Sequence, residues 1–200
     1  NGNGKVVTDI NMSEDLLLAL QVDTNHIYVA GITTAESAGF TGPTGPPRNF
    51  ALVRYNNDGS LDTTFGPDAN GKVVTDINMS EDLGYALQVD TTHIYVAGDT
   101  SAASAGTGPI PPTGDNFSLV RYDKDGSLDT SFGPDGNGKV VTDINMTNDK
   151  AYTLQLDTNH IYAAGFAADN TGPNFALVRY DKDGSLDTTF GPDANGKVVT

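Results

Sequence analysis

The repeat is clearest in the stretch Asn49-Phe50-Ala51-Leu52-Val53-Arg54-Tyr55-Asn56-Asn57-Asp58-Gly59-Ser60-Leu61-Asp62-Thr63-Thr64-Phe65-Gly66-Pro67, which returns almost letter for letter at residues 116–134 and 174–192. A second stretch, Lys-Val-Val-Thr-Asp-Ile-Asn-Met, begins at Lys5, Lys72 and Lys139, and Lys197 opens a shortened copy. The chain is therefore one structural unit written three times, and its fold depends on how such units pack together.

The spacing of the copies locates the one connection that changes length. The Lys-Val-Val copies begin 67, 67 and 58 residues apart, and the whole difference falls between Gly165 and Arg179. The corresponding segments are residues 32–48, 99–115 and 166–173, which are rich in Ser, Ala, Gly, Thr and Pro. Because Pro lacks a backbone donor and Gly disfavours extended order, we expect three surface loops that vary around a rigid repeat.

Within one unit, short β-branched and aromatic runs alternate with turn residues. They predict strands over 72–77, 85–90, 93–98 and 117–122, with a tight turn at Thr91-Thr92 that makes the middle two a hairpin. The fourth run ends at Asp125-Gly126, where Gly supplies a positive φ angle. No stretch has a convincing helical period, so each unit is expected to be a sheet of four short antiparallel strands.

The apolar pattern of these strands predicts stacking. Phe50 to Val53 and Leu177-Val178 are apolar without alternation, which is typical of strands covered on both faces. One four-stranded sheet cannot cover both of its own faces, so the sequence predicts an all-β fold of tandem β-propeller-like blades. A β-solenoid is the competing interpretation, and an immunoglobulin-like sandwich is disfavoured. We expect Phe50, Phe117 and Phe175 to be buried.

The residues that carry a family resemblance fall in every unit. They are Phe117-Ser118-Leu119-Val120-Arg121-Tyr122, Asp125-Gly126-Ser127-Leu128-Asp129, Phe132-Gly133, Gly138-Lys139-Val140-Val141 and Ile161-Tyr162-Ala163-Ala164-Gly165. In these the sequence resembles the delta-60 repeat, a bacterial β-propeller repeat family, and it departs from it in the hairpin turn and in the Pro/Gly-rich insert. The resemblance implies a propeller fold and a bacterial surface or secreted protein.

The domain prediction follows the repeat. Residues 1–10 are expected to be a strand of a preceding or partner blade, followed by repeats at 11–77, 78–144 and 145–200. Three units do not close a ring, because propellers usually have about four to eight blades. Residues 3–8 equal residues 195–200. We therefore expect a larger ring or array, or head-to-tail assembly with identical copies, which gives a filament where it does not close.

Composition limits the partners. The net charge is −15, which disfavours nucleic acid and anionic membranes. There is no Cys, so disulfides and thiol chemistry are excluded. No apolar stretch approaches the roughly 20 residues of a membrane span.

The acidic turns are candidate Ca²⁺ sites. Each has oxygen-bearing side chains at positions 1, 3 and 7 around a Gly, and oxygen ligands on a tight loop suit Ca²⁺. The leading position of a calcium loop is occupied by Arg54, Arg121 or Arg179, however. The alternative, which we favour, is an Asp-Gly turn whose last Asp bonds the backbone or pairs with Arg. The candidate ligands are Asn56, Asp58, Asp62, Asp123, Asp125, Asp129, Asp181, Asp183 and Asp187.

Other recurring polar residues have structural explanations. His26, His93 and His160 are expected to be turn residues on separate blades. An Arg in an apolar strand needs a carboxylate partner, either Asp62, Asp129 and Asp187 or Asp9, Asp76 and Asp143. Asn11, Asn78 and Asn145 each begin an Asn-x-Ser/Thr pattern, which is a glycosylation acceptor or simply a capped turn.

Because nearly every notable polar residue occurs three times, the sequence gives no reason to expect an enzyme or a cofactor other than Ca²⁺. The first functional hypothesis is an extracellular structural or adhesive repeat protein, a self-assembling filament or surface-layer component. The alternative is a propeller that binds glycan or a surface protein through the Pro/Gly-rich loops. A hydrolase ranks third.

Overall fold

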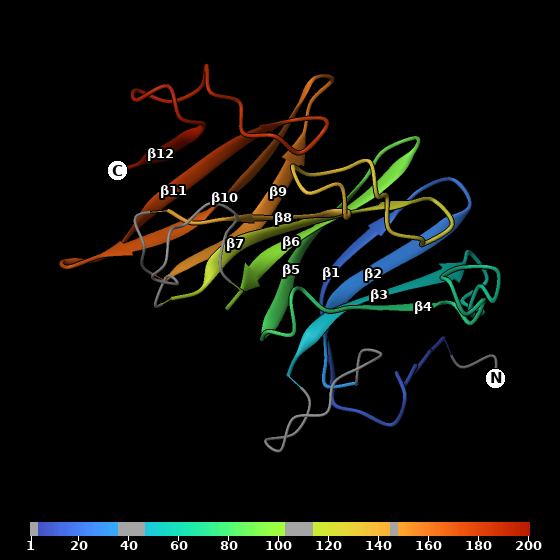
Figure 1. Cartoon of the computed structure of the whole chain (residues 1–200). Coiled ribbons are helices and arrows are strands. Elements are labelled where there is room, and N and C mark those ends of the chain that lie inside the picture. The colour runs from blue at the N-terminus through green and yellow to red at the C-terminus, as the bar shows by residue number, and fades with distance from the viewer. Residues whose placement is uncertain (1–3, 36–46, 103–113, 145–147) are drawn as a thin grey trace.

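The computed structural model describes residues 4–35, 47–102, 114–144 and 148–200. Within these ranges the chain is all β, and its strands form three four-stranded antiparallel sheets, which we call blades 1, 2 and 3. The blades follow one another along the molecule, and the two ends of the chain lie far apart at opposite sides of it (Figure 1). The predicted tandem propeller-like blades are confirmed.

The strand bounds repeat closely from blade to blade. Blade 1 contains β1 (Asp15–Val22), β2 (His26–Thr33), β3 (Asn49–Asn56) and β4 (Lys72–Thr75). Blade 2 contains β5 (Asp82–Val89), β6 (His93–Thr100), β7 (Asn116–Asp123) and β8 (Lys139–Thr142). Blade 3 contains β9 (Asp149–Leu156), β10 (His160–Asp169), β11 (Gly172–Asp181) and β12 (Lys197–Val199).

The strand that begins at Lys72 does not belong with the strands that follow it in the sequence. It pairs antiparallel with β3, with Phe50 opposite Thr75, and so becomes the last strand of blade 1. The turns between β3 and β4 bring the chain back beside β3, whereas the polar segment after Thr75 crosses to blade 2. Each Lys-Val-Val strand therefore closes the blade before it.

The first strand of each blade contains a bulge that brings it close to the second strand of the same blade. In blade 2 the register shifts between Gly84 and Ala86, which leaves Tyr85 as the extra residue. Gly98 lies opposite, and a Cβ there would meet the Leu83 carbonyl oxygen at 1.8 Å. The chain therefore requires glycine at this position, as it does at the equivalent Gly31 and Gly165.

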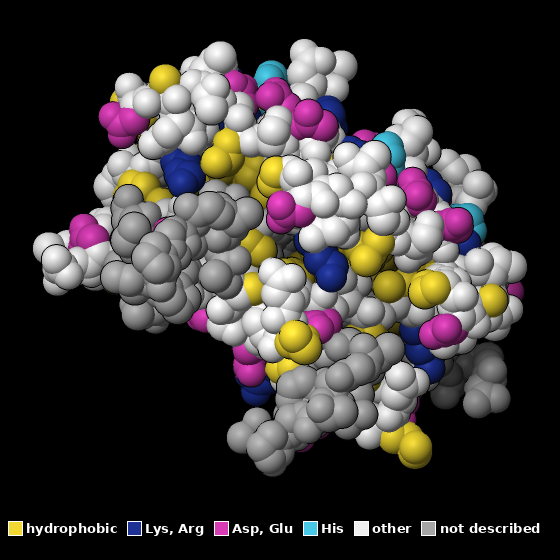
Figure 2. All heavy atoms as spheres, viewed as in Figure 1, with side chains coloured by type: hydrophobic (Ala, Val, Ile, Leu, Met, Phe, Trp, Pro, Cys, Tyr) yellow, Lys and Arg dark blue, Asp and Glu magenta, His cyan; other side chains and the backbone are white. Residues whose placement is uncertain are grey.

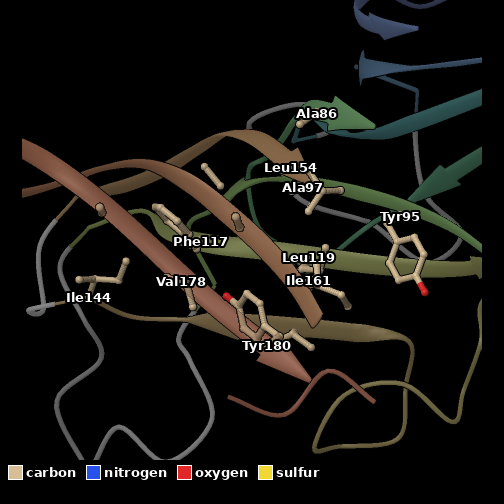
Figure 3. Packing of buried hydrophobic residues seen from close by; sticks show 14 of the residues in the cluster. Ala86, Tyr95, Ala97, Phe117, Leu119, Ile144, Leu154, Ile161, Val178 and Tyr180 are labelled. Atoms are coloured by element: carbon tan, nitrogen blue, oxygen red, sulfur yellow. The ribbon is translucent and has the colours of Figure 1, made fainter. Parts of the chain in front are cut away.

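Two apolar cores fill the spaces between blades. One joins blades 1 and 2, and the other joins blades 2 and 3 through Phe117, Leu119, Leu154, Ile161 and Val178 (Figure 3). We call the face of a blade that packs on the following blade its exit face, which in blade 2 carries Tyr95, Phe117 and Leu119. The opposite face, which in blade 2 carries Leu87, Val96 and Val120, is its entry face.

Two expectations need correction. Phe50 and Phe117 are buried as predicted, but Phe175 is exposed, because none of the three sheets of the described residues covers the exit face of blade 3. Residues 166–173 are not a loop: shortening leaves a two-residue turn, and β10 and β11 extend through most of the segment. Residues 4–10 form no strand within this copy, and their expected place in a preceding or partner blade stays a prediction. The other two predicted loops fall largely outside the described residues.

Candidate functional site

The acidic turns of blades 2 and 3 each dock onto the blade before them. Arg54 of blade 1 donates from Nη1 to the Lys124 carbonyl of blade 2, and the Gly66 amide donates to the Asp125 carbonyl at 2.7 Å. We call this contact the turn latch. The same two bonds join blades 2 and 3, through Arg121 with Lys182 and Gly133 with Asp183.

A buried ion pair holds the latch arginine. In blade 2, Arg121 Nε and Nη2 lie 2.7 and 2.6 Å from Asp129 Oδ2, and the guanidinium lies over the Phe132 ring. Burial by itself would raise the pKa of Asp129, but the bonds from Ser131 and Arg121 hold it below its ordinary value. The structure thus pairs Arg with the Asp eight residues later, one of the two partners predicted. The matching pairs are Arg54–Asp62 and Arg179–Asp187.

A histidine joins each ion pair. His93 Nε2 lies 3.3 Å from Asp129 Oδ2 and 3.9 Å from Asp123 Oδ1. His93 begins a strand, as its sequence pattern predicted, but its association with Asp129 was not predicted, because 36 residues separate the two. Ligand atoms of two such groups lie within 4.8 Å of one another and could hold a metal ion: His93, Asp123 and Asp129, and His160, Asp181 and Asp187.

The remaining candidate Ca²⁺ ligands serve their own turns. Asp125 Oδ1 accepts bonds from the Ser127 amide at 2.9 Å and the Ser127 hydroxyl at 2.6 Å, and Asp58 and Asp183 do the same with Ser60 and Ser185. Neither of the two groups that could hold a metal ion includes Asp125 or Asp183. In each group one Asp is already paired with an arginine: Asp129 with Arg121, and Asp187 with Arg179. These contacts match the turn interpretation, and Ca²⁺ binding stays a prediction.

In the Asn-x-Ser turns the Asn side chain is exposed, and the Ser hydroxyl is hydrogen-bonded to the backbone. Asn78 is exposed with a φ of 59°, and Ser80 Oγ donates to the Ile77 carbonyl at 2.5 Å. Asn11 has the same environment, whereas Asn145 lies outside the described residues. The turn interpretation accounts for Ser80, and glycosylation stays a prediction.

Blade 1 presents an open entry face. Leu20 is 58% exposed, whereas the equivalent Leu87 of blade 2 and Leu154 of blade 3 are 6% and 2% exposed. In blades 2 and 3 the preceding blade covers this face. Hydrophobic side chains gather at the surface around β1 and β2 (Figure 2). The face is therefore built like one that receives a blade.

Blade 3 presents an open exit face. Phe175 is 83% exposed, whereas the equivalent Phe50 and Phe117 are each 1% exposed. Half of a turn latch is present there as well: Arg179 is paired with Asp187, but its buried Nε has no partner among the described residues. The other half of a latch is the turn Asn57-Asp58-Gly59 of blade 1, which contacts no preceding blade in the described structure.

Residues 4–10 lie where the last strand of a preceding blade would lie, but they pair with no sheet in the described structure. Tyr55 donates to Thr8 Oγ1 at 2.7 Å, as Tyr122 donates to Thr75 of β4 at the same distance. Ile10 is buried like its equivalents in the later units. The segment therefore lies against blade 1 as β4 lies against blade 2.

One polar cluster is not repeated, and it lies between blades 2 and 3. Lys150 Nζ lies 3.1 Å from Asp99 Oδ2 and 3.0 Å from Asp115 Oδ2. Asp99 is buried, and within the described structure its Oδ1 has no hydrogen-bond partner. Burial raises the pKa of the Asp99 carboxyl to about 6, against the opposing effect of the Lys150 charge. Blade 1 carries Ile32 where blade 2 carries Asp99.

Aromatic rings line up beside this cluster. The Tyr85 and Tyr152 rings are 5.2 Å apart, and the Tyr152 and Phe166 rings are 5.9 Å apart. This row of rings was not predicted from the sequence, because the strands and bulges that bring the rings together are remote in sequence.

Comparison with known proteins agrees with the fold. Three segments match the model of a family described as "Domain of unknown function (DUF5122) beta-propeller", namely residues 24–65, 113–132 and 157–190. Each matched segment contains the acidic turn of one blade, at residues 57–59, 124–126 or 182–184. No curated protein matches the chain. The description does not name the delta-60 repeat, so that finer resemblance stays a prediction. The matched segments together cover less than half of the chain, and the description of that family agrees with the three stacked sheets.

Proposed function

We propose that this protein is an extracellular structural or adhesive repeat protein that assembles from identical copies. Blade 3 of one copy stacks on blade 1 of the next, and the result is a ring or a filament. One observation carries the proposal: the two open faces are the two halves of the contact that already closes both internal junctions. Exposed groups of large apolar side chains commonly mark interaction surfaces.

The latch supports the same head-to-tail order. In the proposed contact, the Asn57-Asp58-Gly59 turn takes the place that Lys124-Asp125-Gly126 takes on blade 1. Its carbonyls then accept from Arg179 and from the Gly191 amide, as the equivalent groups do at the internal junctions. A heterologous contact of this kind closes into a ring or continues as a filament according to its rotation.

The last strand of blade 3 has two possible sources in such an assembly. β12 supplies Lys197-Val198-Val199 from the same copy, and residues 5–7 of the next copy supply an identical Lys-Val-Val. Both segments belong at the same position beside β11. We propose that one replaces the other where copies meet.

The test uses two variants that each block one face. Leu20→Asp blocks the entry face and Phe175→Asp blocks the exit face, and since both side chains are exposed, each variant is expected to fold. The unchanged chain is expected to form large species in sedimentation and fibres or rings in electron microscopy, whereas either variant alone stays monomeric.

An equimolar mixture of these two variants retains one intact contact, so it is expected to stop at a dimer. Met79→Asp, at an exposed turn of blade 2, is the control and is expected to leave assembly unchanged. A stable 20.9 kDa monomer of the unchanged chain at high concentration would overturn the proposal.

A second candidate function is the binding of glycan or a surface protein. The row of Tyr85, Tyr152 and Phe166 rings favours it, because aromatic rings stack well on sugar faces. A glycan array probed with the unchanged chain and with Tyr152→Ala tests it: binding that Tyr152→Ala abolishes supports this function, and an array without binding contradicts it.

A further inference from the structure

We propose that one pair of side chains at each junction fixes which blade follows which, and that the open pair of this chain selects blade 1 of a second copy. This inference rests on the proposed function, since it concerns the contact between copies. The first member of the pair follows the glycine that lies opposite the bulge, which is Gly31, Gly98 or Gly165. The second member is the second residue of the first strand of the next blade.

The two internal junctions use different chemistry at this pair. Between blades 1 and 2 the pair is Ile32 and Leu83, which line one groove together with Leu18. Between blades 2 and 3 the pair is Asp99 and Lys150, whose charged atoms are 3.1 Å apart, with Asp99 buried. This pair of positions is therefore apolar at one junction and ionic at the other, although Arg48 and Glu81 form an ion pair elsewhere between blades 1 and 2.

A mismatch at this pair leaves a charge without its partner. Lys150 opposite an apolar residue such as Ile32 would lose the Asp99 carboxylate, and Asp99 opposite Leu83 would be buried without a cation. An unpaired buried charge is strongly unfavourable. The pair therefore rejects wrong neighbours as well as holding the right one, which is how specific contacts commonly discriminate.

The same two positions can be identified on the open exit face of blade 3 and the open entry face of blade 1. Blade 3 carries Phe166 at the first position of the pair, and blade 1 carries Leu16 at the second, where it is exposed. Phe166 and Leu16 are both apolar, so they match each other, whereas Phe166 opposite Lys150 of another blade 3 would be a mismatch. The predicted order is blade 3 followed by blade 1 of the next copy.

The experiment moves the ionic pair to the contact between copies. Leu16→Lys alone and Phe166→Asp alone are each expected to weaken self-association at least tenfold, as measured by sedimentation, while thermal unfolding of the monomer changes little. The chain that carries both substitutions is expected to regain association close to the unchanged level and to lose it again in high salt, because salt screens the new pair.

The matched control combines Leu16→Glu with Phe166→Asp, which places like charges at the same two positions and is expected to stay dissociated. A doubly substituted Lys/Asp chain that associates no better than Leu16→Lys, or a Glu/Asp chain that associates equally well, overturns the inference. If the unchanged chain associates and Phe175→Asp blocks it, the proposed function survives that failure. A monomeric unchanged chain overturns both.

Discussion

Blades 2 and 3 have nearly the same sequence in their third strands, yet the two strands are exposed very differently. β7 is buried at every residue from Asn116 to Tyr122, whereas along β11 buried and more exposed residues alternate. The exposed side of β11 is the exit face, and the buried side packs on blade 2. Burial on two faces is therefore a property of the stack, and a strand that is apolar on both faces indicates a neighbour on both sides.

The first prediction uses the equivalent phenylalanines of these strands. Phe117→Ala is expected to lower the free energy of unfolding by roughly 3–5 kcal/mol, because it empties a buried site between blades. Phe175→Ala is expected to change it by less than about 0.5 kcal/mol in the monomer, because Phe175 is exposed. Urea denaturation at low protein concentration measures both. Equal losses would show that the two faces are not as different as the structure has them.

The sequence was sufficient to predict the blades but not their limits. Unbroken apolar runs such as Phe50 to Val53 predicted stacked sheets, and the Arg–Asp partners were among the stated alternatives. The sequence analysis erred where the answer depends on a neighbour: Phe175 is identical to Phe117 in type and local context but lacks a covering blade. The predicted repeat of residues 11–77 keeps Lys72 with the strands before it, and the pairing of β4 with β3 agrees with that limit.

The candidate site was harder to predict for the same reason. The latch joins Arg54 to the Lys124 carbonyl, and a backbone acceptor 70 residues away has no sequence signature. The unique cluster depends on Lys150 reaching Asp99 across two blades. The acidic turns were noticed because they repeat, but their repetition reflects docking between blades and does not by itself indicate a ligand.

The second prediction concerns how protein stability depends on pH at the ionic pair of Asp99 and Lys150, compared with the apolar pair of Ile32 and Leu83. The pKa of Asp99 rises from 3.8 to about 6 on folding, so ionising it costs the folded state stability as the pH rises between these values. Asp99→Asn removes that cost and leaves Lys150 beside Asp115. Between pH 4 and pH 7 the stability of the variant is therefore expected to rise relative to the unchanged chain, by up to roughly 3 kcal/mol.

Chemical denaturation of both proteins at several pH values measures this difference. Other carboxyls with raised pKa values, such as Asp82, are present in both proteins and cancel in the comparison. Ile32→Val, at the equivalent position of the apolar pair, is the control and is expected to give a pH-independent difference. A constant difference for Asp99→Asn as well would contradict a buried, ionising Asp99.

The third prediction concerns the one place where the open contact departs from the closed ones. Blade 1 carries Leu17 where blade 2 carries Gly84 and blade 3 carries the buried Ala151. A Cβ at Gly84 would already lie 3.0 Å from the Gly31 carbonyl oxygen of the preceding blade. A leucine at this position crowds an incoming blade, so the contact between copies is expected to be weaker than the contact within a copy.

Leu17→Gly is therefore expected to tighten self-association about tenfold, since overpacking of this kind commonly costs 1–3 kcal/mol and the substitution removes it. Leu18→Gly, at the neighbouring bulge residue, is the control for the added backbone freedom and is expected to give no gain. Sedimentation equilibrium of the two variants separates these outcomes. A weaker association after Leu17→Gly would mean that Leu17 is itself part of the contact, and that copies meet in a geometry wider than that of the internal junctions. The stack within a copy and the stack between copies would then be two different interfaces built from one repeat.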